Sequence, residues 1–133
     1  MRGIRAYQNV DRHTSVIAAN PMELVLLTYE ALIRRLKQAE EAFAVSDVAA
    51  RGEAVSRALE VIEKGLVGAL DLNGGGELAK QLMKQYQLWS IQLLRCNLNA
   101  DPELLGAVIN QVVTVRSAWE ELKLEAQRER ALG

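Results

Sequence analysis

Few side chains in this 133-residue sequence are of the types that carry out chemistry. His13 is its one histidine and Cys96 its one cysteine. A di-iron site in a helical protein needs Glu-x-x-His pairs on two helices, and one histidine cannot supply them. One cysteine forms neither an internal disulfide nor a thiolate cage for zinc, and the neighbours Leu93, Leu94 and Leu98 predict a packed, inert thiol. The sequence therefore predicts no metal, no cofactor and no enzymatic activity.

Two other features resemble reactive motifs only in part. His13 could act as a general base, but no nucleophile is marked for it, so a solvated or capping histidine is the simpler interpretation. The segment NGGGE, residues 73–77, is rich in glycine ahead of a helix but lacks the Lys and Ser/Thr of a phosphate-binding loop. Glu77 would also place a carboxylate where an anion should bind. We predict a tight turn between two helices there.

Composition limits the class of protein further. Apolar residues make up 50% of the chain and charged residues 25%, which is typical of a single soluble domain at this length. The 16 basic and 17 acidic residues are interspersed, so no concentrated basic face is available for nucleic acid. The longest apolar runs, such as residues 24–27, are too short to cross a bilayer, and the amino terminus lacks a signal-peptide pattern. These observations predict a cytoplasmic protein that neither binds nucleic acid nor inserts stably into membranes.

Four helices are predicted from start signals and apolar spacing. Pro21 follows Asn20 and Pro102 follows Asp101, and proline is favoured at the first helical position after such caps. The first helix should end near residue 45 and the second should begin after Ser46 or Asp47. Residues 71–79 should turn the chain into a third helix, which ends around 97–100, before the fourth begins. The predicted inward residues are Val25, Tyr29, Leu32, Leu36, Ala39, Phe43; Val55, Leu59, Ile62, Leu66, Leu70; Leu78, Leu82, Tyr86, Trp89, Leu93; and Leu105, Val108, Val112, Val115, Trp119, Leu122.

These helices predict an all-α fold, an antiparallel four-helix bundle with an apolar N-terminal arm. The chain forms one domain, with the arm at residues 1–19, the bundle at 20–126 and a polar tail at 127–133 that frays or extends into solvent. Gly65 and Gly68 lie inside the second helix, where each favours close packing against a neighbour.

The helices carry more apolar residues than one stripe each requires. The surplus comprises Met22, Leu26, Ile33, Met83, Ile91, Leu94, Leu104, Ile109 and Val113. Such residues either widen the core or form a groove for another amphipathic helix.

Several segments, in this order and spacing, resemble the FliS family of flagellin-specific export chaperones. The segments are AYQNV, NPMELVLLTYEALI, LDLNGGGELA, LLRCNLNAD and RSAWEEL, and the resemblance runs from Ala6 to about Leu122. The sequence departs from the family pattern at Thr28, Ala31 and Cys96, where the family commonly has an apolar residue, Gly and Ala. Ala31 would alter how closely a partner or helix approaches the first helix.

The resemblance implies a non-enzymatic chaperone that binds the C-terminal helical segment of flagellin, prevents its premature polymerisation and delivers it to a component of the flagellar export gate. It also implies an arm near the binding surface, with Ile4, Tyr7, Val10, Val16 and Ile17 covering an apolar groove until flagellin binds. The predicted partner-binding residues are Tyr7, Val10, Leu24, Leu27, Ile33, Tyr86, Leu94 and Asn97. The alternative is a helical adaptor that binds another amphipathic helix of the flagellar or a regulatory system. A homodimer formed through the groove is a further possibility.

Overall fold

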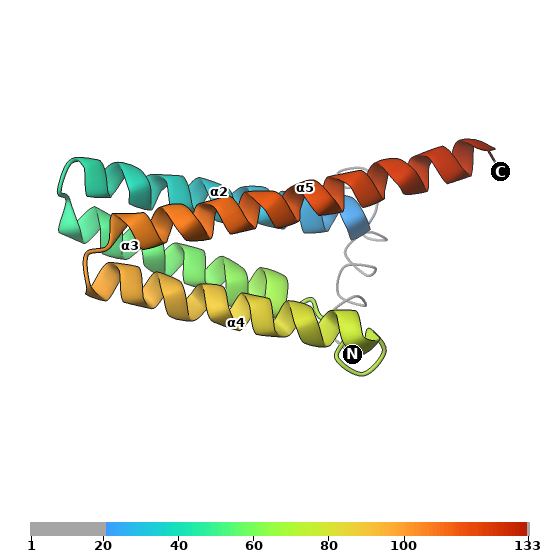
Figure 1. Cartoon of the computed structure of the whole chain (residues 1–133), viewed down its shortest axis with the longest axis horizontal. Helices are drawn as coiled ribbons and strands as arrows, with labels where there is room; N and C mark the ends of the chain where they lie inside the picture. The colour runs from blue at the N-terminus through green and yellow to red at the C-terminus, as the bar shows by residue number, and fades with distance from the viewer. Residues whose placement is uncertain (1–20, 133) are drawn as a thin grey trace.

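The computed structural model describes residues 21–132 of the chain. The predicted arm, with Ile4, Tyr7, Val10, Val16 and Ile17, and the predicted cap Asn20 lie outside the described residues. The elements are α2 (Pro21–Ala44), α3 (Val48–Glu60), the π-helical segment η1 (Val61–Val67), α4 (Gly76–Leu98) and α5 (Pro102–Leu132). Consecutive long helices run in opposite directions and pack side by side (Figure 1). The predicted all-α four-helix bundle is confirmed.

Short polar turns join the helices at the end of the bundle where α2 meets α3 and α4 meets α5. Asp47 caps α3, because its carboxylate accepts a hydrogen bond from the Ala50 N–H at 3.0 Å. Asp101 accepts one from the Leu104 N–H at 3.0 Å in the same way. The residue at the bend of each turn, Ser46 or Ala100, has a positive φ of 56° or 50°. The predicted starts of α3 and α5 are therefore confirmed.

The core consists of one buried stripe from each helix. Its largest fully buried side chains are Tyr29, Leu32, Leu36, Val55, Ile62, Trp89, Leu93, Cys96, Leu105, Val108 and Val112. Two of the surplus residues, Leu26 and Ile109, are also buried and widen this core. Core widening therefore explains part of the surplus, whereas Ile91, Leu94 and Val113 are exposed.

Two residues of the predicted inward stripes are exposed to solvent. Leu78 is 58% exposed and Leu122 is 47% exposed, so the prediction that they form core was wrong. Leu78 lies in the first turn of α4, at the end of the bundle, and α5 continues beyond the start of α2 (Figure 1). Apolar residues can keep the same spacing along a helix beyond the point where the neighbouring helices end. The spacing alone therefore does not show which of these residues are buried.

The apolar spacing suggested that the second helix is α-helical throughout, but the structure differs. It becomes π-helical at Val61, and its widened bonding includes the Gly68 N–H donating to the carbonyl of Glu63, five residues earlier, at 2.9 Å. Gly65 packs closely, since a Cβ there would lie 2.7 Å from Cγ2 of Thr28 on α2. The prediction for Gly68 was wrong, because a Cβ there would meet the carbonyl oxygen of Lys64 in its own segment at 2.6 Å.

The fourth helix extends beyond residue 126, the predicted end of the bundle. α5 remains helical to Leu132, and residues 127–132 are exposed. The tail therefore extends into solvent as helix instead of fraying. Within residues 21–132, none of the helices has the length and apolar character needed to span a membrane.

Candidate partner-binding surface

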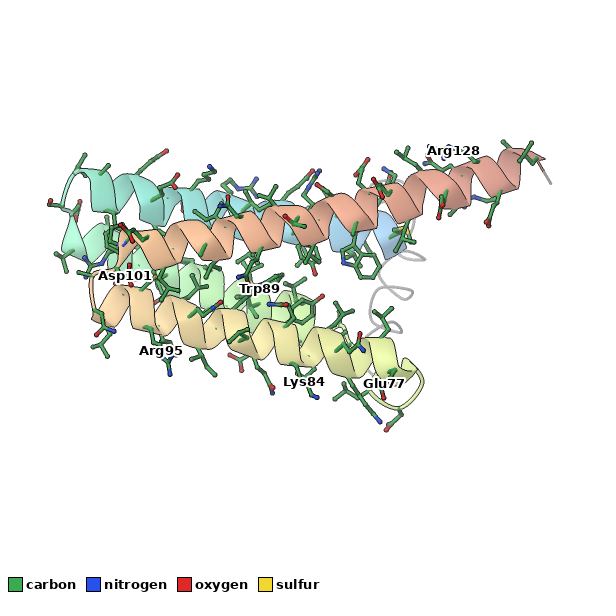
Figure 2. The ribbon with its side chains drawn as sticks, in the orientation of Figure 1. Glu77, Lys84, Trp89, Arg95, Asp101 and Arg128 are labelled. Atoms are coloured by element: carbon green, nitrogen blue, oxygen red, sulfur yellow. The ribbon has the colours of Figure 1, made fainter. Side chains whose placement is uncertain are left out.

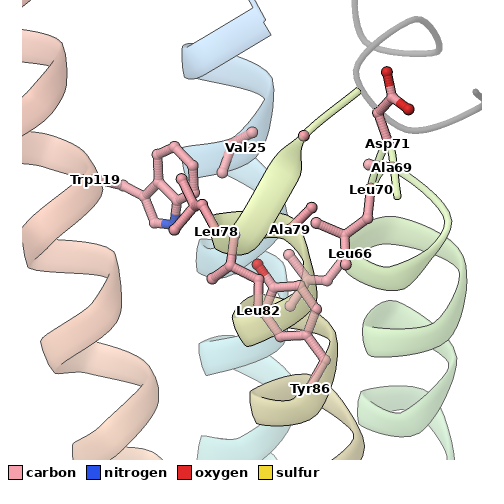
Figure 3. Close-up of a pocket in the computed structure, with 11 residues that line it drawn as sticks. Val25, Leu66, Ala69, Leu70, Asp71, Leu78, Ala79, Leu82, Tyr86 and Trp119 are labelled. Atoms are coloured by element: carbon pink, nitrogen blue, oxygen red, sulfur yellow. The ribbon is translucent and has the colours of Figure 1, made fainter. Parts of the chain in front are cut away.

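The end of the bundle near the glycine-rich loop contains an apolar cavity of about 100 Å³ (Figure 3). α2, η1, α4 and α5 all contribute side chains to its wall, together with the loop that follows η1. The lining residues are Val25, Leu66, Ala69, Leu70, Asp71, Gly75, Leu78, Ala79, Leu82, Tyr86 and Trp119. Figure 3 shows Trp119 reaching across from α5 toward Val25 and Leu78. The cavity is therefore a meeting point of all four helices, suited to apolar side chains.

An aromatic cluster closes the cavity on the side of the core. The Tyr86 hydroxyl lies 2.8 Å from that of Tyr29, close enough for a hydrogen bond. The ring centroid of Trp89 lies 5.7 Å from that of Tyr86 and 6.3 Å from that of Tyr29. Such tilted and edge-to-face pairs stabilise beyond the area they bury. Tyr86, a predicted binding residue, is 2% exposed, so it lines the cavity as part of the core.

A second apolar surface is the groove between α2 and η1. It is lined by Leu24, Leu27, Thr28, Ala31, Glu60, Val61, Lys64 and Gly65. Leu27 lines the groove and is 52% exposed. The groove is shallow at Gly65, where the two backbones approach closely against Thr28. The structure thus brings the predicted residues Leu24 and Leu27 together, with Ala31 on the same wall.

Leu94 and Asn97 belong to a different part of the molecule. They lie near the far end of α4, and the eleven residues from Tyr86 to Asn97 correspond to roughly 16 Å of helix. Leu94 is 56% exposed. Asn97 is partly buried and tied to α3, since the guanidinium of Arg51 donates to its side-chain oxygen at 2.9 Å and its backbone carbonyl at 3.1 Å. The structure therefore does not join these two residues to the cavity or groove.

Ile33 and the cysteine are parts of the packed interior. Ile33 is partly buried against the core. Cys96 is buried as predicted, and its thiol donates to the carbonyl of Leu93 at 3.2 Å. Burial raises the pKa of the Cys96 thiol, the charge of Asp101 raises it further, and Arg51 opposes the shift. Among residues 21–132, no group of three or more His, Cys, Asp or Glu side chains is placed to hold a metal ion.

Sequence reasoning placed most of the cavity lining on the inward stripes but did not predict a cavity. Trp119 and Leu70 were predicted as inward residues, and Ala79 was not singled out at all. All three line the open cavity, and Trp119 and Leu70 are only partly buried. One signal was present in the sequence, because the inward stripes of the second and third helices run up to the glycine-rich loop from its two sides.

The fold and these surfaces define a helical bundle in which, among residues 21–132, apolar side chains line a cavity and a groove at one end. The family model for the flagellar protein FliS matches residues 3–126, most of the chain. This chain therefore belongs to the FliS family.

Named relatives agree with that assignment over almost the full length of both chains. The chain is 32% identical over 124 residues to the flagellar secretion chaperone FliS of Salmonella typhimurium, covering 93% of this chain and 92% of the relative. It is 31% identical over 126 residues to FliS of Vibrio cholerae, covering 94% and 92%. It is 32% identical over 120 residues to FliSB of Pseudomonas aeruginosa, covering 90% and 94%. The class of function is thus a flagellar export chaperone, which implies a protein without catalytic activity.

Proposed function

We propose that this protein is a cytoplasmic chaperone that binds the C-terminal helical segment of flagellin and keeps it from polymerising. It then delivers that flagellin to a component of the flagellar export gate. The observation that carries the proposal is the pair of apolar surfaces, the cavity and the α2–η1 groove, in a member of the FliS family.

The two surfaces suit an amphipathic helical client. Apolar side chains of the client would enter the cavity and contact Leu82 and Trp119. In the groove the client would contact Leu24 and Leu27, beside Lys64. Each apolar side chain buried on binding contributes about 1.5–3 kcal/mol. A helix with anchors spaced along one face could use both surfaces, since η1 lines both. A client that orders as it binds can cover a large area and still be released at the gate.

The arm is proposed to regulate access to this surface. In the free protein Ile4, Tyr7, Val10, Val16 and Ile17 would cover apolar surface and be displaced by flagellin. A few aliphatic anchors can be displaced, since their contribution is offset by the entropy of ordering the segment. Tyr7→Ala should therefore change flagellin affinity while leaving the free energy of unfolding of the bundle unchanged.

The direct test is calorimetric titration with full-length monomeric flagellin and with flagellin that lacks its C-terminal helix. The proposal expects binding of the first and none of the second. Equal binding of both would place the recognised segment elsewhere in flagellin. Binding of neither would leave the adaptor for another amphipathic helix as the better hypothesis.

Two matched variants then locate the client on the chaperone. Leu27→Ala removes an exposed leucine of the groove, and Val45→Ala removes an exposed valine from the turn at the other end of the bundle. We expect Leu27→Ala to weaken flagellin binding about tenfold, the loss of about 1.4 kcal/mol of apolar contact. Val45→Ala should bind like the wild type.

A further inference from the structure

The solvent-facing side of α4 combines basic and apolar side chains. This surface, called the α4 face below, consists of the exposed residues Lys80, Lys84, Leu88, Ile91, Arg95 and Leu98. Their steps of three and four along the chain place them on one side of the helix. Figure 2 shows Lys84 and Arg95 on the outer side of α4, whereas Trp89 points into the bundle.

The charge of the α4 face differs from that of the chain as a whole. Residues 80–98 contain three basic residues and no acidic one, although the chain has 17 acidic residues and a net charge of −1. Within residues 21–132, none of the ion pairs involves a basic residue of the α4 face, whereas Lys37 and Arg57 each pair with a glutamate of their own helix. The α4 face therefore presents a local positive charge beside apolar side chains.

The shape and chemistry of the α4 face narrow the kind of partner. The outward side of a single helix is convex, and the cavity and the α2–η1 groove are lined by other residues. A convex face encloses no ligand, but it fits against a flat, deformable surface. Nucleic acid would account for the cations and not for the leucines. A membrane surface with anionic lipids accounts for both, because its headgroups attract cations and its acyl boundary accepts apolar side chains.

We propose that the α4 face binds the surface of a membrane that contains anionic lipids. α4 lies parallel to that surface over the roughly 27 Å of helix between Lys80 and Leu98. The basic side chains contact the headgroup phosphates, and the apolar side chains enter the boundary between headgroups and acyl chains. The contact is peripheral, and no part of the helix crosses the bilayer.

The contact needs both kinds of side chain. Clusters of about four to eight basic residues are typical of membrane binding through charge, and the α4 face has three. The apolar part is available, since Leu88 is 46%, Ile91 47% and Leu98 83% exposed. The proposed membrane contact is separate from the proposed client surface, because the residues that line the cavity and the groove take no part in it.

Sedimentation of the full-length protein with lipid vesicles tests the proposal. One set of vesicles contains phosphatidylcholine and phosphatidylserine in equal parts, and the other contains phosphatidylcholine alone. The wild type should bind the mixed vesicles better, and this binding should weaken as salt rises from about 0.05 M to about 0.5 M. A wild type that stays unbound at low salt, or that binds both sets equally, would overturn the proposal.

A charge variant and a matched control locate the contact. Lys80→Gln with Lys84→Gln removes two positive charges from the α4 face, and each loss should weaken binding to the mixed vesicles about fivefold. Arg34→Gln with Lys37→Gln removes the same charge from the exposed side of α2 and should bind more tightly than the α4 variant, close to the wild type. Equal weakening in both variants would mean that the charge of the whole protein, and not the α4 face, governs binding.

An apolar variant tests the second part of the contact. Leu88→Ser with Ile91→Ser keeps the charge and should weaken binding to the mixed vesicles at least about tenfold. Because both residues are exposed, urea unfolding should match that of the wild type. Wild-type binding by this variant would contradict the proposed entry of apolar side chains.

Titration with flagellin separates this proposal from the proposed function. The charge variant and the apolar variant should both bind flagellin as the wild type does while losing vesicle binding. Variants that lose flagellin and keep vesicle binding would assign the α4 face to the client, and the membrane proposal would be wrong.

Discussion

The two ends of the bundle are built in opposite ways. At the end formed by the turns 45–47 and 99–101, directional polar contacts hold the helices in place. Asp47 and Asp101 cap α3 and α5, and Arg51 bonds twice to Asn97 across the α3–α4 interface. The guanidinium of Arg51 also lies 4.8 Å from the centroid of the Phe43 ring. At this polar end Arg51 therefore links α3 to α4 and to the end of α2.

The opposite, apolar end is joined between helices by the ion pair of Lys123 on α5 with Glu23 on α2, at 3.5 Å. Its loop is held by its own Asp71, whose carboxylate accepts from the N–H groups of Asn73 and Gly74. Gly76 has a φ of +63°, a conformation that favours glycine. Beyond the loop lie the cavity, the exposed Leu78 and the π-helical η1. The apolar end thus combines a loop that is held by local hydrogen bonds with apolar side chains that line a cavity.

The aromatic cluster marks the border between the two ends, and its loss should have the largest effect. Trp89→Ala removes a fully buried side chain that contacts Tyr29 and Tyr86 and donates to Gln111 at 3.0 Å. It should lower the free energy of unfolding by about 3–5 kcal/mol. Trp119→Ala, at a half-buried wall of the cavity, should cost only about 1–2 kcal/mol. Urea unfolding measures both, and equal losses would contradict the contrast between the ends.

The close approach of η1 to α2 should have the next largest effect. Gly65→Ala places a Cβ 2.7 Å from Cγ2 of Thr28, and overpacking of this kind costs about 1–3 kcal/mol. Thr28→Ser removes that methyl group and keeps the hydroxyl, which donates to the carbonyl of Leu24 at 2.9 Å. The double variant should therefore recover most of the stability lost by Gly65→Ala. If thermal unfolding shows the two losses adding instead, the contact does not limit the packing of η1.

A polar substitution at the rim of the cavity should change binding but hardly stability. Leu78→Ser exposes no new core, because Leu78 is already exposed, so the free energy of unfolding should change by less than about 0.5 kcal/mol. Flagellin affinity should fall about tenfold, since one apolar contact of the client is lost. Val48→Ser, an equally exposed aliphatic at the polar end, is the control and should leave affinity unchanged. Similar affinities for the two variants would remove the cavity from the client site.

Local signals in the sequence were sufficient for the polar end and insufficient for the apolar end. The caps Asp47 and Asp101 depend on neighbouring residues alone, and both were predicted. The π-helical turns of η1 lie where Gly65 packs against Thr28, a residue far away in the sequence, and apolar spacing did not show them. Leu122 illustrates the same limit, since its exposure depends on where α2 begins.

The candidate site was predicted only in pieces for a related reason. Leu27 lay outside the inward stripes and proved to be exposed on the groove. Tyr86 was placed on the correct face, but periodicity cannot tell a buried cavity wall from a docking surface. The cavity itself forms only where the ends of α2, η1, α4 and α5 meet. The sequence predicted the third and fourth helices, but it did not predict that they lie beside Leu70.

The smallest predicted effect concerns the thiol at the polar end. Burial raises the pKa of Cys96 in the folded state above the ordinary value of 9.0, while the unfolded chain keeps that ordinary value. Well below pH 9.0 both states hold the proton and this group contributes no pH dependence. Above it the unfolded chain loses the proton first, so stability falls as pH rises toward the folded pKa. Cys96→Ala should remove the contribution of the thiol to the fall in the free energy of unfolding between pH 8 and about pH 10, as measured by urea unfolding. An identical decline in the variant would show that the thiol remains as easily ionised in the fold as outside it.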